Sequence, residues 1–150
     1  MKKYKGLTTE KILKVCEGSN SFQKAKIISS KGSCEYIKQF YSDDIEIFES
    51  FFILMLNRAN NTIGYVKISQ GGCVGTVVDI KLIAKYCIDS LCQNVILAHN
   101  HPTGNIQPSQ ADKDITEKIK KGLRLLDITV LDHVILTKND YYSFADEEIL

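Results

Sequence analysis

Residues 99–112, with the sequence HNHPTGNIQPSQAD, constrain the fold of this chain more than any other stretch. They follow an apolar run at 94–98 (NVILA) whose length and composition are typical of a buried strand. Alternate residues of a strand lie on one face, so His99 and His101 are expected to point the same way. Two imidazoles placed like this can bind one metal ion at about 2.0–2.1 Å per nitrogen. The stretch therefore predicts a strand that ends in two potential metal ligands.

A helix is predicted to begin after Ser109, because apolar side chains recur there at helical spacing. They are Ala111, Ile115, Ile119, Leu123 and Leu126. At about 100° per residue, Asp112 lies within roughly 20° of Ile119 and Leu123 and so faces the core. A carboxylate in that place is costly unless it is paired, hydrogen-bonded or bound to a metal. The two histidines before it supply a reason, and the three side chains together predict a metal site.

Each part of this pattern also has a simpler interpretation. Ser109 and Asp112 fit a capping box, in which Ser109 caps the helix and Asp112 is favoured near its positive end. A pair of strand histidines that stands alone is more often structural than ligating. Neither interpretation explains why both features occur together, with seven residues between His101 and Ser109. The combination favours metal binding.

The order His-x-His, seven residues, Ser-x-x-Asp is the motif of the JAMM (MPN+, JAB-domain) zinc metalloproteases. Segments 96–104 (ILAHNHPTG) and 131–133 (LDH) resemble the RadC-like branch of that family, and the resemblance runs from about Glu46 to Phe144. It implies an α/β fold of the cytidine deaminase-like type, with a central mixed β-sheet flanked by helices. It also implies a short form that lacks the helix-hairpin-helix DNA-binding module of longer RadC-like proteins.

The resemblance implies roles for individual side chains. His99, His101 and Asp112 would bind one Zn²⁺ per chain. Ser109 would stabilise the oxyanion of the reaction, and Glu49 would act as the general base. Two imidazoles and one carboxylate leave the fourth zinc position open, which is typical of catalytic rather than structural zinc. The implied reaction is hydrolysis of a peptide or isopeptide bond in a peptide or protein substrate by a zinc-activated water.

The assignment of Glu49 depends on the strand that follows it. Residues 51–56 are almost continuously apolar, which predicts the first strand of a hairpin at 49–69, buried on both faces. Glu49 at the mouth of this strand could lean over a site, although a solvated strand-end carboxylate is the simpler interpretation. Glu46 would point to the opposite face of an extended strand, and the alignment with the RadC-like strand selects Glu49.

The chain is expected to divide into an N-terminal extension, 1–44, packed on a JAB domain at 45–150. Its sequence predicts a marginal helix at 9–16, a strand at 25–28 and a helix at 33–41. The motif assigns no function to any of these three elements.

The rest of the chain predicts supporting elements. A glycine-rich loop at 71–76 lacks a phosphate-binding pattern and leads to a helix at 79–92. Strands are predicted at 128–136 and 141–144, and His133 in the first of them is expected to be a hydrogen-bonded core residue outside the metal site. The helix at 79–92 is expected to turn five residues inward: Leu82, Ile83, Tyr86, Cys87 and Leu91.

Composition limits the function classes. The formal net charge is +1, so the sequence shows no basic footprint for nonspecific DNA binding, and any DNA affinity is expected to be weak. No apolar run is long enough to span a bilayer, and the start of the chain lacks the apolar core of a secretory signal, so we expect a cytoplasmic protein without a membrane partner. Five cysteines without a C-x-x-C pair suit reduced, buried thiols that take no part in catalysis.

The residues leave two classes of function open. The first is the JAMM-type zinc metallopeptidase. The second is a RadC-like DNA-repair-associated or protein-binding module whose metal site is structural or idle. A zinc nucleobase deaminase is disfavoured, because the sequence lacks the His-x-Glu and Pro-Cys-x-x-Cys ligands of that class.

Overall fold

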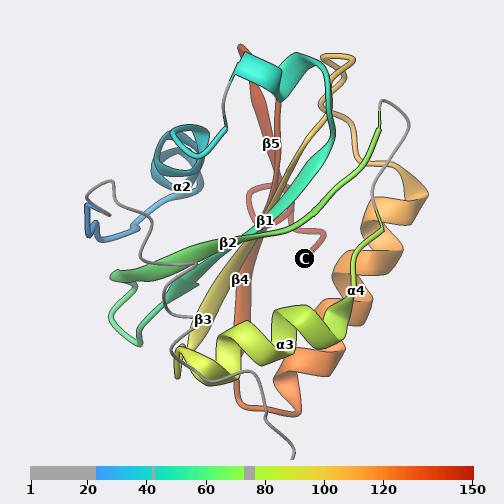
Figure 1. Cartoon of the computed structure of the whole chain (residues 1–150). Coiled ribbons are helices and arrows are strands. Elements are labelled where there is room, and N and C mark those ends of the chain that lie inside the picture. The colour runs from blue at the N-terminus through green and yellow to red at the C-terminus, as the bar shows by residue number, and fades with distance from the viewer. Residues whose placement is uncertain (1–22, 42, 73–76) are drawn as a thin grey trace, which may run out of the picture.

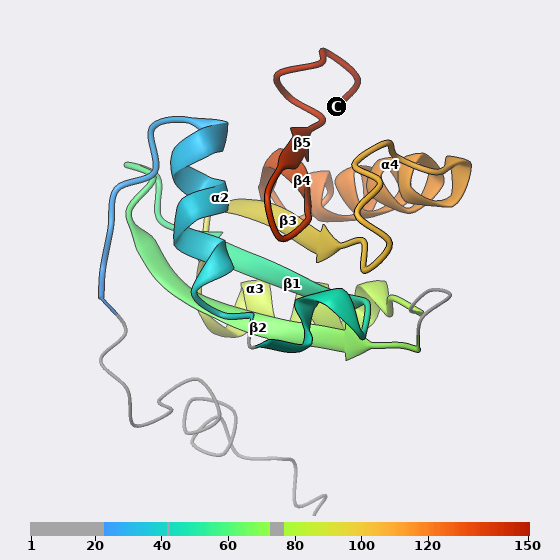
Figure 2. The same ribbon diagram turned by 90° about the horizontal axis from the view of Figure 1, so that it is seen from above.

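The structure, a computed structural model, describes residues 23–41, 43–72 and 77–150. Within this part of the chain the strands form one mixed five-stranded sheet, and helices cover both of its faces (Figures 1 and 2). The elements are α2 (Ser30–Lys38), the 3-10 helix η1 (Asp43–Glu46), β1 (Ser50–Leu56), β2 (Thr62–Gln70), α3 (Ile80–Asp89), β3 (Asn94–Asn100), α4 (Gln110–Arg124), β4 (Thr129–Leu136) and β5 (Tyr141–Ser143). The predicted α/β fold with a central mixed sheet is confirmed.

The sheet has the strand order β2-β1-β3-β4-β5. β3 and β4 run parallel, and the other neighbours are antiparallel. The predicted hairpin of β1 and β2 is present, and every residue of β1 is buried, as its continuous apolar run predicts. β3 lies beside β1, with His99 opposite Phe51, so the end of β3 that carries the histidine lies next to the beginning of β1.

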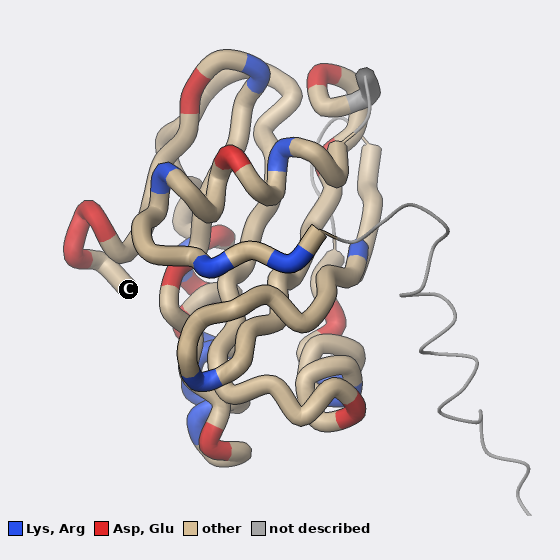
Figure 3. The backbone as a smooth tube through the Cα atoms, turned by 90° about the vertical axis from the view of Figure 1, so that its left-hand side faces the viewer, with Lys and Arg blue, Asp and Glu red and all other residues tan. Residues whose placement is uncertain are grey.

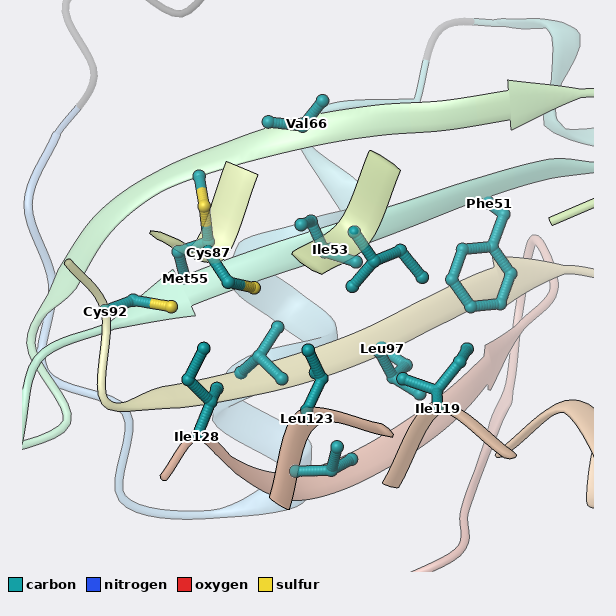
Figure 4. Close-up of a cluster of buried hydrophobic side chains, with 13 residues drawn as sticks. Phe51, Ile53, Met55, Val66, Cys87, Cys92, Leu97, Ile119, Leu123 and Ile128 are labelled. Atoms are coloured by element: carbon teal, nitrogen blue, oxygen red, sulfur yellow. The ribbon is translucent and has the colours of Figure 1, made fainter. Parts of the chain in front are cut away.

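The side chains of β1 alternate between two hydrophobic clusters. Its odd-numbered residues at 51–55 pack with side chains of α3 and α4 in the cluster that Figure 4 shows. Its even-numbered residues at 52–56 pack with side chains of α2. β3 alternates in the same way, with Leu97 in the first cluster and Ala98 in the second. The two residues that follow, His99 and Asn100, therefore face opposite layers of the molecule.

Helix α3 is shorter than its prediction. Asp79 caps its N-terminus by accepting from the N–H of Lys81, but the helix ends at Asp89. Leu91 then adopts a positive φ of 51° and is 75% exposed, and Leu82 is also exposed, so their predicted inward positions are wrong. The buried face of α3 contains Ile83 and Cys87, as predicted.

The described part of the N-terminal extension forms less regular structure than predicted. The expected strand at 25–28 is reduced to a single bridge between Lys26 and Asn61. Helix α2 begins three residues earlier than predicted, because the hydroxyl of Ser29 accepts from the N–H of Gly32 and caps it, and it ends at Lys38. The predicted helix at 9–16 and most of the loop at 71–76 lie outside the described residues. The domain boundary at 44/45 stays a prediction.

Charged residues are interspersed on one side of the described structure. Figure 3 shows acidic and basic positions interspersed on the side that carries α2, in keeping with the net charge of +1. None of the helices within the described ranges is long and apolar enough to cross a membrane. Cys34, Cys87 and Cys92 are buried and free, and burial raises the pKa of Cys34 to about 12, which keeps its thiol protonated.

Candidate metal centre

The end of β3 and the start of α4 bring the three predicted ligands together. The Nε2 atoms of His99 and His101 lie 2.9 Å apart. Asp112 approaches them from the first turn of α4, with Oδ1 3.2 Å from His99 Nε2 and Oδ2 3.6 Å from His101 Nε2. One ligand atom from each side chain lies within 4.8 Å of the others, so the three residues could hold a metal ion.

Hydrogen bonds determine which nitrogen of His101 is free to bind a metal. The Nδ1 atom of His101 lies 2.6 Å from the carbonyl oxygen of Asn105, which can only accept a hydrogen bond. Nδ1 therefore carries the proton, and in the neutral ring Nε2 presents a lone pair. The turn that brings Asn105 back to His101 depends on Gly104, whose φ of 81° favours glycine and whose N–H donates to the carbonyl of His101 at 3.1 Å.

A longer chain of hydrogen bonds determines the tautomer of His99. The hydroxyl of Thr116 donates to the carbonyl of Asp112 at 2.5 Å, so it must accept from Nδ1 of His133, which is also 2.5 Å away. Nε2 of His133 is then an acceptor for Nδ1–H of His99, at 2.8 Å. Burial holds the pKa of His133 well below its ordinary value and keeps this ring neutral. His99 thus presents the lone pair of Nε2.

Three lone pairs consequently converge at one point: two imidazole nitrogens and a carboxylate oxygen. Such groups repel one another unless a cation lies between them. In a tetrahedral zinc site with bonds of about 2.0–2.1 Å, neighbouring ligand atoms lie roughly 3.3 Å apart. The 2.9 Å between the two Nε2 atoms and the 3.2 Å from His99 to Asp112 are close to that spacing. The donor set and its geometry fit a zinc-sized ion.

The carboxylate of Asp112 and the imidazole of His101 shift each other's pKa. Burial works against the charged form of Asp112, but protonated His101 and His99 would donate to this carboxylate, and their proximity holds its pKa well below its usual range. Asp112 in turn raises the pKa of His101. A proton therefore competes with a metal ion for His101, and metal affinity is expected to fall as the pH falls.

The spacing of Ser109 and Asp112 fits both a capping box and a metal site, and the structure is compatible with both. The hydroxyl of Ser109 accepts from the N–H of Asp112 at 3.2 Å, and Asp112 Oδ2 accepts from the N–H of Ser109 at 2.7 Å, which completes a capping box. The same Oδ2 accepts from the Ser109 hydroxyl at 2.5 Å. The cap holds the carboxylate in the orientation that faces both histidines, so capping and metal binding are one arrangement rather than alternatives.

Glu49 and Glu46 lie in different surroundings. Glu49 lines a cavity of about 460 Å³ together with all three potential ligands and Ser109. Glu46 belongs to η1, where the sequence predicted extended chain, and pairs with Lys138 at 2.8 Å on the surface. The side chains of His101 and Asp112 are each 15% exposed, so solvent reaches the potential metal site through this cavity.

His133 is the residue of the site that the sequence pattern did not reveal. The sequence predicts a hydrogen-bonded core residue outside the metal site, and His133 is fully buried and hydrogen-bonded, but its partner is the potential ligand His99. The signal for this role was a histidine inside an apolar strand, on the parallel neighbour of β3. Only the strand order shows that this histidine lies behind His99.

Replacement of His133 by leucine is expected to lower zinc affinity by about 10- to 100-fold, because Nδ1–H of His99 loses its acceptor and the ring loses its fixed tautomer. Competition with a chromogenic chelator measures this affinity. Val130→Ala is a matched control, since Val130 is buried in the same strand away from the metal site. It should lower stability without weakening zinc binding. Unchanged affinity in His133→Leu would contradict the role assigned to His133.

The fold and the site together define a class of protein. A mixed sheet covered by helices on both faces, with two histidines and an aspartate at a strand-to-helix junction, is the arrangement expected of an α/β domain of the JAB type with a potential metal site. The sequence model of the RadC-like JAB domain matches residues 27–149. The chain therefore belongs to the RadC-like JAB domain family.

Individual relatives agree with this membership. The chain is 48% identical to a UPF0758 protein of Flavobacterium johnsoniae over 101 residues, which cover 67% of this chain and 44% of the relative. It is 35% identical to a UPF0758 protein of Coprothermobacter proteolyticus over 134 residues, 88% of this chain and 57% of the relative. It is 40% identical to the UPF0758 protein YfjY of Escherichia coli K12 over 102 residues, 68% and 64% of the two chains. The chain spans about half the length of the first two relatives.

Proposed function

We propose that this domain is a zinc-dependent hydrolase that cleaves a peptide or isopeptide bond with water. The observation that carries the proposal is the convergence of two imidazole lone pairs and one carboxylate at a cavity that also contains a second carboxylate, Glu49. Three protein ligands leave room for water and a substrate carbonyl, as in catalytic zinc sites. Family membership adds to this support.

Zinc bound at this site would lower the pKa of a water molecule towards neutrality and polarise the substrate carbonyl. Glu49 would accept the proton of the attacking water and pass it to the leaving amine. Its place in the wall of the cavity, without a role as a ligand, suits this double transfer. Hydrogen bonds would keep the two ligand histidines in the tautomers that present Nε2. His133 and Thr116 do this for His99, and the carbonyl of Asn105 does it for His101.

Ser109 has a more restricted role in the proposal. Its hydroxyl donates to Asp112 Oδ2 in the structure, so it must turn away from Asp112 to donate to the oxyanion of the substrate. Asp112, as a ligand of an ion, would be a weaker acceptor for the Ser109 hydroxyl, which would then be free to turn. Ser109 would then stabilise the negative charge that develops on the carbonyl oxygen.

The test of the proposed function is a screen of peptide and lysine-isopeptide libraries with zinc-loaded protein. Cleavage that stops after chelation and returns with added zinc supports the proposal. Cleavage that persists in His101→Ala protein would come from a contaminating protease, and the absence of zinc-dependent cleavage in both libraries would contradict the proposed reaction.

The competing proposal, a DNA-repair-associated or protein-binding module, makes a different prediction for DNA. With a net charge of +1, and with charges interspersed on the side that carries α2, the chain is expected to make few phosphate contacts. Its affinity for a labelled duplex at near-physiological ionic strength should be weaker than about 10 µM and should fall with salt. A fluorescence anisotropy titration measures it. Submicromolar binding would show that the second class of function is the better description.

A further inference from the structure

Asn100 separates the two histidines in the sequence but faces the other side of the sheet. Its side chain is fully buried, on the face of β3 where Ala98 packs towards α2. A buried amide has two donor hydrogens and an acceptor oxygen, and all of them need partners. The partners of Asn100 therefore show what this residue does in the fold.

The three side-chain hydrogen bonds of Asn100 to described residues go to one short segment of backbone, residues 45–50. Its Oδ1 accepts from the N–H of Ser50 at 2.8 Å. Its Nδ2 donates to the carbonyl of Ile45 at 2.6 Å and to the carbonyl of Phe48 at 2.8 Å. These contacts lie on both sides of Glu49, so one buried amide holds the segment that carries the proposed general base.

The segment needs such an anchor because most of it lies outside the sheet. It runs from η1 to the first residue of β1, and Ile47 and Phe48 are exposed. The ion pair of Glu46 with Lys138 is on the surface, where such pairs contribute little. The backbone of Glu49 bonds to Gly71 and Gly72, at 2.8 and 3.5 Å, which ties it to the end of β2. Beyond the β1–β3 ladder that begins with Phe51 opposite His99, the contact of this segment with the strand that carries the histidines comes from Asn100.

We propose that Asn100 is a positioning residue that fixes Glu49 relative to the metal site. The backbone of β3 directs His99 and His101 to one face and Asn100 to the other, so a single three-residue stretch would set the ligands and the base together. The inference rests on the proposed function, since it assigns Glu49 the role of base. A displacement of about 1 Å at a catalytic group can reduce the rate about 10²-fold without loss of binding.

The test compares Asn100→Ser with Asn57→Ser. Asn57 is a matched control, because its Oδ1 also accepts two backbone N–H bonds, from Ala59 and Asn61, but in the turn after the opposite end of β1. Asn100→Asp is a second variant that keeps an acceptor for Ser50 and loses both donors. Each protein is loaded with zinc and assayed on a fluorogenic form of a peptide found in the library screen.

Asn100→Ser and Asn100→Asp are expected to bind one zinc with an affinity within about threefold of wild type. Their kcat should fall by roughly 10- to 100-fold while KM changes little, and Asn57→Ser should keep the wild-type kcat. In a Glu49→Gln background, loss of Asn100 should cause no further fall, because the group it positions is already inactive. The inference would be overturned if the Asn100 substitution lowered kcat further in the Glu49→Gln background. It would also be overturned if the Asn100 variants kept the wild-type kcat, or if they lost zinc affinity together with kcat.

Hydrogen–deuterium exchange supplies a readout that does not depend on a substrate. In Asn100→Ser the amide of Ser50 should exchange at least about tenfold faster than in wild type, while amides in the centre of β3 keep their protection. Unchanged exchange at Ser50 would overturn the inference even if no peptide is cleaved. If exchange accelerates and wild-type protein cleaves no peptide, the proposed function fails, and Asn100 still anchors the segment.

Discussion

Zinc-loaded Glu49→Gln protein is expected to keep its metal and its fold but to lose at least about 10²-fold in hydrolysis. The amide cannot accept a proton from the attacking water, yet it has nearly the same shape as the carboxylate. Because Glu49 lines the cavity without belonging to the cluster of potential ligands, zinc content should not change. Steady-state kinetics on a peptide from the library screen, together with elemental analysis of the same sample, measures both quantities.

Glu46→Gln is the matched control for this prediction. Glu46 lies three residues earlier and makes an exposed ion pair with Lys138, so its loss should leave kcat and KM close to wild type. If Glu46→Gln abolished turnover while Glu49→Gln did not, the base would be assigned to the wrong residue. If neither substitution mattered, the site would not act as a hydrolase of the proposed kind.

Removal of one ligand is expected to have the largest effect on metal binding. His99→Ala and Asp112→Ala should each lower zinc affinity by more than the roughly 10- to 100-fold loss that follows changes in groups behind a ligand. Two converging groups remain in each variant, too few to compete with water and buffer for the ion. Isothermal titration with zinc, or elemental analysis after gel filtration, measures the loss.

Two controls separate ligand loss from damage to the helix. Ser109→Ala breaks the capping box at a cost of about 1 kcal/mol but keeps the three ligands, so it should still bind zinc. Asp114→Ala removes an exposed carboxylate of the same helix that pairs with Gln110, and it should leave zinc affinity unchanged. Zinc content that is undiminished in both His99→Ala and Asp112→Ala would exclude this cluster as the metal site.

Local patterns were sufficient to predict that the three potential ligands would lie together. The apolar run before His99 predicted a buried strand, and the helical period after Ser109 predicted which face of α4 carries Asp112. Strand and helix periods are properties of neighbouring residues, so the sequence alone contains them. The approach of the three side chains within 4.8 Å follows from these two elements and from the connection 101–109, which returns the chain to the end of β3.

Contacts across the sheet could not be predicted in this way. The hydrogen bond from His99 to His133 requires β4 to lie parallel beside β3, and that depends on strand order. The contacts from Asn100 to residues 45–50 require β1 to lie on the other side of β3. Both residues were visible in the sequence as polar side chains within apolar strands, but their partners were not.

Element ends were the weakest part of the prediction. The periodicity at 79–92 extends past Asp89, but Leu91 takes a left-handed conformation that no helix continues through. The early start of α2 has a local cause, the cap by Ser29, which the sequence also contains. The chain at Glu46 forms a 3-10 helix rather than an extended strand. Glu46 therefore belongs to η1 and Glu49 lies just before β1, and the two do not lie on opposite faces of one strand, as the sequence predicted.

The central claim is that His99, His101 and Asp112 bind one metal ion through the lone pairs that converge between them. Anomalous diffraction at the zinc absorption edge, from crystals grown with one equivalent of zinc, tests it most directly. We predict one strong anomalous peak per chain, about 2.0–2.1 Å from Nε2 of both histidines and from a carboxylate oxygen of Asp112. An anomalous peak elsewhere on the chain, with these three side chains bound to no metal, would contradict it.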